Sequence, residues 1–137
     1  MRIFLHASVL FPAAKSDGAV RELLALLEKA GHECCADAYV IEEARRNLLA
    51  KAPPHCVVTL EKLLSRMTTA GAQRSDAAFG ASLPLPSKDQ PVLAAAISQG
   101  CAALVTGDRT HFGTLYGKTI NGVTIHSPRS LAQALLL

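Results

Sequence analysis

Short apolar runs alternate along the chain with longer segments in which apolar residues recur every three or four positions. The run over residues 2–5 leads directly to His6 and predicts a first buried strand. The apolar positions of residues 20–27 have the i, i+3, i+4, i+7 spacing of an amphipathic helix, and Gly31 is placed to end it. Residues 32–36 predict a second strand. The first quarter of the chain therefore predicts a strand, a helix and a strand.

The middle of the chain predicts two helices and a loop. Asp37 stands where it can cap a helix that runs to about residue 51, where two consecutive prolines end it. A second helix is predicted from about residue 55 to residue 70. Residues 71–86 contain two glycines and two prolines with little periodicity, which predicts a connecting loop with room for one short strand.

The C-terminal part returns to the alternating pattern. Ser87 and Gln90 have the spacing of a capping box and predict the start of a helix that Gly100 ends. Two further strands, residues 101–106 and 123–126, precede a terminal helix that begins with a Ser-Pro pair. Strands that alternate with helices predict an α/β fold with a parallel sheet covered on both faces. In such sheets ligands bind beyond the carboxyl ends of the strands.

Composition and charge agree with one folded domain over residues 1–137. Half of the residues are hydrophobic and 18% are charged, which excludes a disordered tail, a collagen-like repeat and a small disulfide-built protein. The formal net charge is +3, and no block of Lys and Arg occurs. A polyanionic partner is therefore permitted but not required.

The cysteines and the N-terminus indicate where the protein works. The four cysteines have neither zinc-binding nor secreted-disulfide spacing, so we expect buried, reduced thiols. No apolar stretch approaches 18 residues, and no signal-peptide cleavage pattern follows the N-terminus. We therefore expect a cytoplasmic protein without a membrane segment.

Two aspartates fall at positions where chemistry is expected. Asp89 shares the apolar stripe of its predicted helix and lies near the positive end of that helix, although an aspartate there can also simply complement the helix dipole. Asp108 follows a predicted strand through Gly107, and a plain turn is the commoner use of such a Gly-Asp pair. Because a helix start and a strand end meet at one edge of a parallel sheet, the two carboxylates together can hold a divalent cation.

Glu42 and Glu43 offer a third carboxylate. Both lie at the margin of the apolar arc of their predicted helix, so periodicity does not choose between them. The simpler interpretation is a solvated pair that contacts Arg45 or Arg46 on the same helix.

Several segments in a fixed order resemble the PIN domain family. These are FLHASVLF near the N-terminus, YVIEEARRNLL, DQPVLAAAISQGCAALVTGD and then HFG. The similarity extends over nearly the whole chain. It implies a three-layer α/β/α sandwich around a parallel sheet and, for many members, a ribonuclease that depends on Mg²⁺ or Mn²⁺. Toxins of VapBC-type toxin-antitoxin pairs belong to this family, so the resemblance also implies RNA, an antitoxin protein and a second copy of the chain as partners.

The resemblance assigns candidate site residues one by one. The second acid of the family falls on Glu43, with Glu42 as the weaker choice, the third on Asp89 and the fourth on Asp108. The small polar residue two positions after the first acid falls on Ser8. The metal ligands implied by the resemblance are Glu43, Asp89 and Asp108.

The first acid of the family falls on position 6, where this chain has His6. The exchange removes a formal negative charge from the expected site. Mg²⁺ prefers oxygen ligands, whereas imidazole suits Mn²⁺, Zn²⁺ and other transition ions better. We therefore expect weak binding of Mg²⁺ or Mn²⁺ and an impaired endoribonuclease, with His6 as a substituted catalytic residue.

Three alternatives differ from this hypothesis. The chain can be a catalytically silent PIN module that binds RNA or a protein partner. It can be a metal-free ribonuclease that uses two of His6, His111 and His126 as acid and base. A receiver-type regulator fits the composition, but it would be expected to have an acidic pair after the first strand, which this chain lacks. With only six Phe and Tyr residues, RNA recognition is expected to depend on the phosphate backbone.

Overall fold

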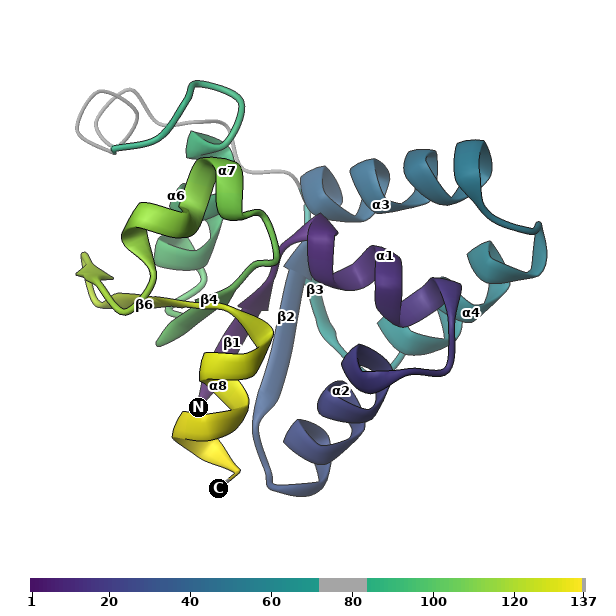
Figure 1. Ribbon diagram of the computed structural model, residues 1–137, viewed down its shortest axis with the longest axis horizontal. Helices are drawn as coiled ribbons and strands as arrows, with labels where there is room; N and C mark the ends of the chain where they lie inside the picture. Colours follow the sequence, from purple (N-terminus) through teal and green to yellow (C-terminus); the bar gives the residue numbers. More distant parts are fainter. Residues whose placement is uncertain (72–83, 137) are drawn as a thin grey trace.

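The computed structural model describes residues 1–71 and 84–136, in which strands and helices alternate (Figure 1). The first half contains β1 (Arg2–Leu5), α1 (Ala7–Lys15), α2 (Ala19–Lys29), β2 (Glu33–Asp37), α3 (Ala38–Lys51), α4 (His55–Leu64) and β3 (Thr68–Ala70). The second half contains α6 (Gln90–Ser98), β4 (Ala103–Val105), α7 (Arg109–Phe112), the 3-10 helix η1 (Gly113–Leu115), β5 (Thr119–Ile120), β6 (Val123–His126) and α8 (Pro128–Leu135).

The strands form one sheet in the order β3-β2-β1-β4-β6-β5. Every neighbouring pair is parallel except β5 and β6, which are antiparallel. Helices flank this sheet, which confirms the predicted α/β/α fold (Figure 1). Since β1 lies between β2 and β4, the residues that follow these three strands meet at one edge of the sheet.

The central strands are buried because both faces of the sheet are covered. Ile3, Phe4 and Leu5 of β1 are completely buried, and Leu104 of β4 packs in the same core. Their continuous apolar runs are typical of strands in parallel sheets. This rigid centre places the residues after β1 and β4 at fixed positions.

Helix ends follow the local signals in the sequence. Asp37 caps α3, since its Oδ1 accepts a hydrogen bond of 3.1 Å from the backbone N–H of Val40. Ser127 and Ser130 form the capping box of α8, and Gly100 has the positive φ of 67° that ends the segment after α6. The predicted helix boundaries at these points are confirmed.

Two predicted boundaries are wrong. The helix predicted to run to residue 70 ends at Leu64, and residues 68–70 form β3 against β2 because an unpaired edge was available there. Ser87 does not cap α6. The N-cap is Asp89, and the Gln90 side chain donates instead to the carbonyl of Leu85. Of the loop predicted over residues 71–86, residues 72–83 lie outside the described residues.

Four elements of the described residues were not predicted at all: α1, α7, β5 and the 3-10 helix η1. Helix α1 contains Pro12 and mostly apolar residues, so it has no polar face that would reveal a helical period. Helix α7 has four residues and β5 has two, which is too short for any periodicity to show. Short elements of this kind are stabilised by tertiary contacts instead of by their own pattern.

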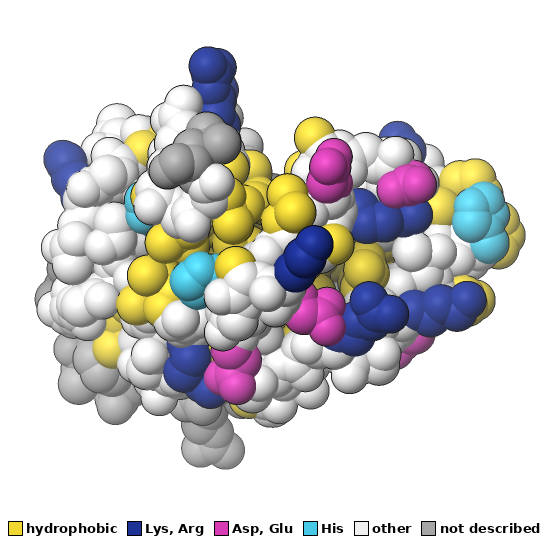
Figure 2. Space-filling model, turned by 90° about the horizontal axis from the view of Figure 1, so that it is seen from below, with side chains coloured by type: hydrophobic (Ala, Val, Ile, Leu, Met, Phe, Trp, Pro, Cys, Tyr) yellow, Lys and Arg dark blue, Asp and Glu magenta, His cyan; other side chains and the backbone are white. Residues whose placement is uncertain are grey.

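All four cysteines are free and buried, as predicted. Across residues 1–71 and 84–136, no helix has the length and apolar character needed to cross a membrane. On the face seen from below, where both chain ends lie, hydrophobic side chains gather at the centre, with charged side chains toward the side of α3 and α4 (Figure 2).

Candidate metal centre

Three polar side chains meet where β1 and β4 end. The Nδ1 atom of His6 lies 2.8 Å from Oγ1 of Thr106 and 3.0 Å from Oγ of Ser8. The two hydroxyl oxygens are 3.2 Å apart. His6 and Thr106 are buried and Ser8 is half-buried, so these hydrogen bonds form largely away from water.

The same hydroxyl groups hold the turn that follows β4. Oγ of Ser8 accepts a hydrogen bond of 2.9 Å from the N–H of Gly107, and Oγ1 of Thr106 accepts one of 3.1 Å from the N–H of Asp108. The turn is thereby fixed to the first residues of α1, which directly follow β1. Ser8 thus orients the backbone that presents Asp108.

Asp108 begins α7 and contacts His111 twice. Its Oδ1 accepts from the backbone N–H of His111 at 3.2 Å, which caps the helix. Its Oδ2 lies 2.8 Å from Nδ1 of the His111 ring. The spacing of three residues at a helix start brings the two side chains together.

Asp89 reaches the same place from the start of α6. It is 5% exposed, and its Oδ2 lies 3.3 Å from Nδ1 of His111. That oxygen nevertheless has no hydrogen-bond partner within the described part of the chain, although it is within ion-pairing distance of the ring. We attribute this to the shorter bond between the ring and Asp108, because one N–H serves one acceptor well. A buried carboxylate oxygen is therefore short of positive charge.

Burial and neighbouring charges shift the two carboxylates in opposite directions. Burial raises the pKa of Asp89, and the charge of Asp108 raises it further, against the opposing effects of His111 and Lys88. The partial burial of Asp108 acts in the same sense, but the hydrogen bonds from the ring and backbone of His111 outweigh it and lower the pKa of Asp108. Asp108 is the better-stabilised anion of the pair.

His6 is a neutral group in the core. Burial lowers its pKa from 6.5 to about 4, with the Asp108 carboxylate opposing that shift. Its ring centroid lies 5.3 Å from that of Phe112, which is completely buried. The imidazole therefore fills the end of the sheet and adds no charge near pH 7.

The two candidate glutamates differ in their surroundings. Glu42 is exposed and Glu43 is half-buried. The pKa of Tyr39 is raised by burial first and then by the charges of Glu43 and Asp89, so both carboxylates act on this phenol. The Tyr39 hydroxyl donates a 2.6 Å hydrogen bond to the carbonyl of Lys88, which joins α3 to the residue before Asp89. This geometry favours Glu43 over Glu42 as the acid directed toward the site.

The residues present fit a divalent cation. Two carboxylate groups from different elements face one another, and the more buried one has an oxygen without a hydrogen bond. A cation of charge two would satisfy that oxygen and neutralise the pair. The fit is to the side chains of Asp89 and Asp108, and Glu43 on α3 is not among the groups that the described residues bring within reach of the same ion.

Sequence reasoning missed Thr106 and passed over His111. The sequence places Thr106 only at the end of an apolar strand, and no pattern reveals that its hydroxyl contacts three groups. His111 stands three residues after Asp108, and this spacing at a helix start was a usable signal. His126 is bound elsewhere, since its Nδ1 lies 3.0 Å from Oγ of Ser130.

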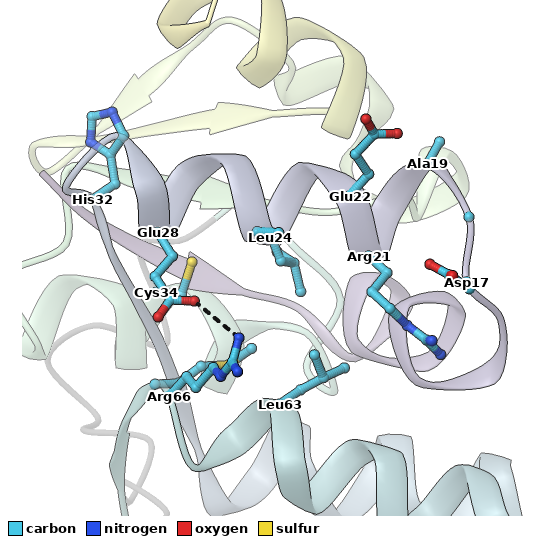
Figure 3. A pocket seen from close by; sticks show the side chains of 13 residues that line it. Asp17, Ala19, Arg21, Glu22, Leu24, Glu28, His32, Cys34, Leu63 and Arg66 are labelled. Atoms are coloured by element: carbon cyan, nitrogen blue, oxygen red, sulfur yellow. Dashed lines mark ion pairs between the residues drawn. The ribbon is translucent and has the colours of Figure 1, made fainter.

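A separate hollow between α2 and α4 contains none of these residues (Figure 3). Its volume is about 610 Å³, and Leu24, Leu63 and Met67 form its apolar lining. The ion pair between Glu28 and Arg66, 3.8 Å long, spans it. The hollow shows no cluster of carboxylates comparable to that of Asp89 and Asp108.

A family model described as a PIN domain matches residues 2–110 of the chain. The chain belongs to the PIN domain family. The match spans β1 to the start of α7. It includes every candidate site residue predicted from the sequence except His111 and His126, which were considered only for a histidine pair. No curated protein sequence matches this PIN domain.

Solved structures share the PIN fold. One chain of VapBC2 from Rickettsia felis, bound to a DNA fragment from its promoter, is 17% identical with a TM-score of 0.69, covering 93% of this chain and 98% of that one. A chain of DNA-bound VapBC from Salmonella typhimurium is 18% identical with a TM-score of 0.66, covering 93% of this chain and 98% of that one. VapC20 from Mycobacterium tuberculosis, described as a Sarcin-Ricin loop cleaving toxin, is 12% identical with a TM-score of 0.59, covering 87% of this chain and 97% of that one. At these identities the similarity is one of fold.

Proposed function

We propose that this PIN domain is a metal-dependent endoribonuclease of the VapC type, weakened by the histidine at position 6. The observation that supports this most is the buried oxygen of Asp89, which faces Asp108 and lacks a hydrogen bond within the described residues. A buried carboxylate oxygen without a hydrogen bond costs free energy, and a bound cation would offset that cost. Membership of the PIN family and the fold shared with VapC20, described as a Sarcin-Ricin loop cleaving toxin, support the reaction class.

In this proposal the acids hold and orient the cation. Asp89 and Asp108 are its ligands, and Glu43 adds a third carboxylate from α3. A divalent cation held there would supply neutralising charge for the phosphodiester and would lower the pKa of a neighbouring water molecule. Mg²⁺ and Mn²⁺ are the candidate ions.

The remaining residues position these groups and the RNA. Ser8 and Thr106 keep the turn of Asp108 rigid, which limits its movement when the cation binds. Lys88 and Arg109 are exposed and directly flank the two aspartates in sequence, so they are placed to meet RNA phosphates.

His6 accounts for the weakening. A neutral imidazole contributes no negative charge, and its Nδ1 is engaged by two hydroxyl groups. The site therefore has less charge to attract a dication than one with a carboxylate at position 6. The same observation favours a second candidate function, a catalytically silent PIN module that binds RNA or a protein.

We further propose that the protein acts in the cytoplasm as one half of a toxin-antitoxin pair. The chains of similar fold include VapBC complexes from two bacteria. An antitoxin protein is therefore the partner we propose first, and a second copy of the chain is another.

A cleavage assay separates the two candidate functions. The unmodified chain and the His6→Asp variant are incubated with a labelled RNA across a Mn²⁺ titration. We expect His6→Asp to cleave faster by about 10²-fold or more, because a ligand charge is restored where the phosphate reacts. If both proteins are equally inert on several RNAs, the silent module replaces the nuclease as the proposed function.

A further inference from the structure

The ring of His111 lies between the two aspartates. Its Nδ1 is 2.8 Å from Oδ2 of Asp108 and 3.3 Å from Oδ2 of Asp89. One ligand atom from each residue lies within 4.8 Å of the other two, and the described residues contain no other such group of three. The site thus has two oxygen donors and one nitrogen donor in reach of a single ion.

Several contacts hold the ring in this place. The backbone N–H of His111 is bonded to Asp108, so residue 111 sits in the first turn of α7 whatever its side chain. The next residue, Phe112, is completely buried and packs against the ring of His6. The backbone of His111 is therefore fixed from both sides, and its ring is 28% exposed at the mouth of the site.

Position 6 does not offer an equivalent donor. Nδ1 of His6 is shared between the hydroxyl groups of Thr106 and Ser8, and the side chain is 5% exposed. Turning Nδ1 toward a cation would break two hydrogen bonds, and neither ring nitrogen of His6 belongs to a group of three candidate ligands among the described residues. The imidazole that is available to the site is the one at position 111.

We propose that His111 is a metal ligand in this chain and completes, with Asp89 and Asp108, a two-carboxylate, one-imidazole site that selects a transition-metal dication over Mg²⁺. The inference deepens the proposed nuclease function and rests on its cation site. The Asp89 side chain is more than nine-tenths buried, and its Oδ2, which has no hydrogen-bond partner among the described residues, points to an ion at this place.

The donor set explains the selectivity. Mg²⁺ requires near-octahedral oxygen ligands and gives up its water reluctantly. Imidazole nitrogen is a good ligand for Zn²⁺, Fe²⁺ and neighbouring ions, and mixed carboxylate and histidine sets are typical of such metals. The exchange of an acid at position 6 for histidine is thus partly compensated by a nitrogen ligand on α7.

The test uses Mn²⁺ alone, followed by electron paramagnetic resonance. Bound Mn²⁺ is titrated to obtain Kd, and pulsed spectra are searched for coupling to a ligand ¹⁴N nucleus. We expect the unmodified chain to show this coupling, and Mg²⁺ to displace Mn²⁺ only in large excess. The variant His111→Asn should lose the ¹⁴N coupling and bind Mn²⁺ at least about tenfold more weakly. The matched variant His55→Asn, at an exposed histidine of α4, should change neither.

A second variant guards against a simple folding defect. His111→Asp keeps the helix cap, because the cap uses the backbone of residue 111. It should lose the ¹⁴N coupling while gaining affinity for Mg²⁺ relative to Mn²⁺. Persistent ¹⁴N coupling in His111→Asn, or no Mn²⁺ binding by the unmodified chain, would overturn the assignment. If RNA cleavage requires Mn²⁺ but the ¹⁴N coupling persists in His111→Asn, the proposed nuclease function stands and only the assignment of His111 as a ligand is refuted. Coupling to ¹⁴N that depends on His111, found without any RNA cleavage, would support the ligand assignment and refute the proposed nuclease function.

Discussion

Replacing Thr106 with valine tests whether the buried hydroxyl group holds the site together. Valine has nearly the same shape, so the substitution leaves no cavity and removes only polar contacts. The Thr106 hydroxyl is completely buried and contacts Nδ1 of His6 at 2.8 Å, Oγ of Ser8 at 3.2 Å and the N–H of Asp108 at 3.1 Å. Its loss therefore affects three groups at once.

The three groups that contact the Thr106 hydroxyl keep different shares of their hydrogen bonds in Thr106→Val. His6 and Ser8 still contact one another at 3.0 Å, and Ser8 still accepts from Gly107. The N–H of Asp108 loses its side-chain acceptor, and this residue is only half-buried, so water replaces part of the bond. We therefore expect Thr106→Val to lower the free energy of unfolding by about 2 kcal/mol, within the usual cost of unsatisfied buried groups.

Equilibrium unfolding in urea measures this loss, with Thr119→Val as the control. Thr119 is exposed and bonded to the hydroxyl of Thr124, so its substitution should change stability by less than about 0.5 kcal/mol. The Thr106 variant should also bind Mn²⁺ more weakly, because the turn of Asp108 is less rigid. A Thr106→Val protein as stable as the control, with unchanged Mn²⁺ affinity, would refute the role given to this hydroxyl.

Two further predictions concern pH and the contact of α3 with the site. Burial lowers the pKa of His6 to about 4 in the folded protein, against 6.5 for an unperturbed histidine, so the contribution of His6 to stability is full above pH 6.5 and is lost as pH falls toward 4. With chelator present, the free energy of unfolding of the unmodified chain should therefore fall by about 3 kcal/mol more over this pH range than that of His6→Asn. Parallel plots of this free energy against pH for the two proteins would contradict the prediction. Tyr39→Phe removes the 2.6 Å bond to the Lys88 carbonyl and should cost less than about 1 kcal/mol of stability because the bond is exposed. It should nevertheless weaken Mn²⁺ binding several-fold, and unchanged binding in a calorimetric titration would show that this bond does not position Asp89.

The regular part of the fold could be predicted because its signals are local. The strand before His6, the cap at Asp37 and the glycine stop at Gly100 depend on nearest neighbours in the sequence. The end of α4 could not be predicted in this way. Residues 65–70 continue the helical pattern, and only the open edge of β2 draws residues 68–70 into the sheet.

The candidate site shows the same division. Asp89 and Asp108 follow from their places at a helix start and a strand end. The contact of His111 with both aspartates depends on how α6 and α7 meet, and these helices are separated by a strand in the sequence. The neutral state of His6 likewise follows from its burial against Phe112, which no spacing indicates.

The most direct test of the central claim is the rate of RNA cleavage at saturating Mn²⁺ by His6→Asp, compared with the same protein after a further Asp89→Asn exchange. Asparagine keeps the size of Asp89 but removes the charge that faces Asp108, so the two proteins differ mainly in the ability to hold the cation. The account predicts rapid, chelator-sensitive cleavage by the first protein and a loss of about 10²-fold or more in the second. Equal cleavage rates for the two proteins, unaffected by chelator, would contradict it.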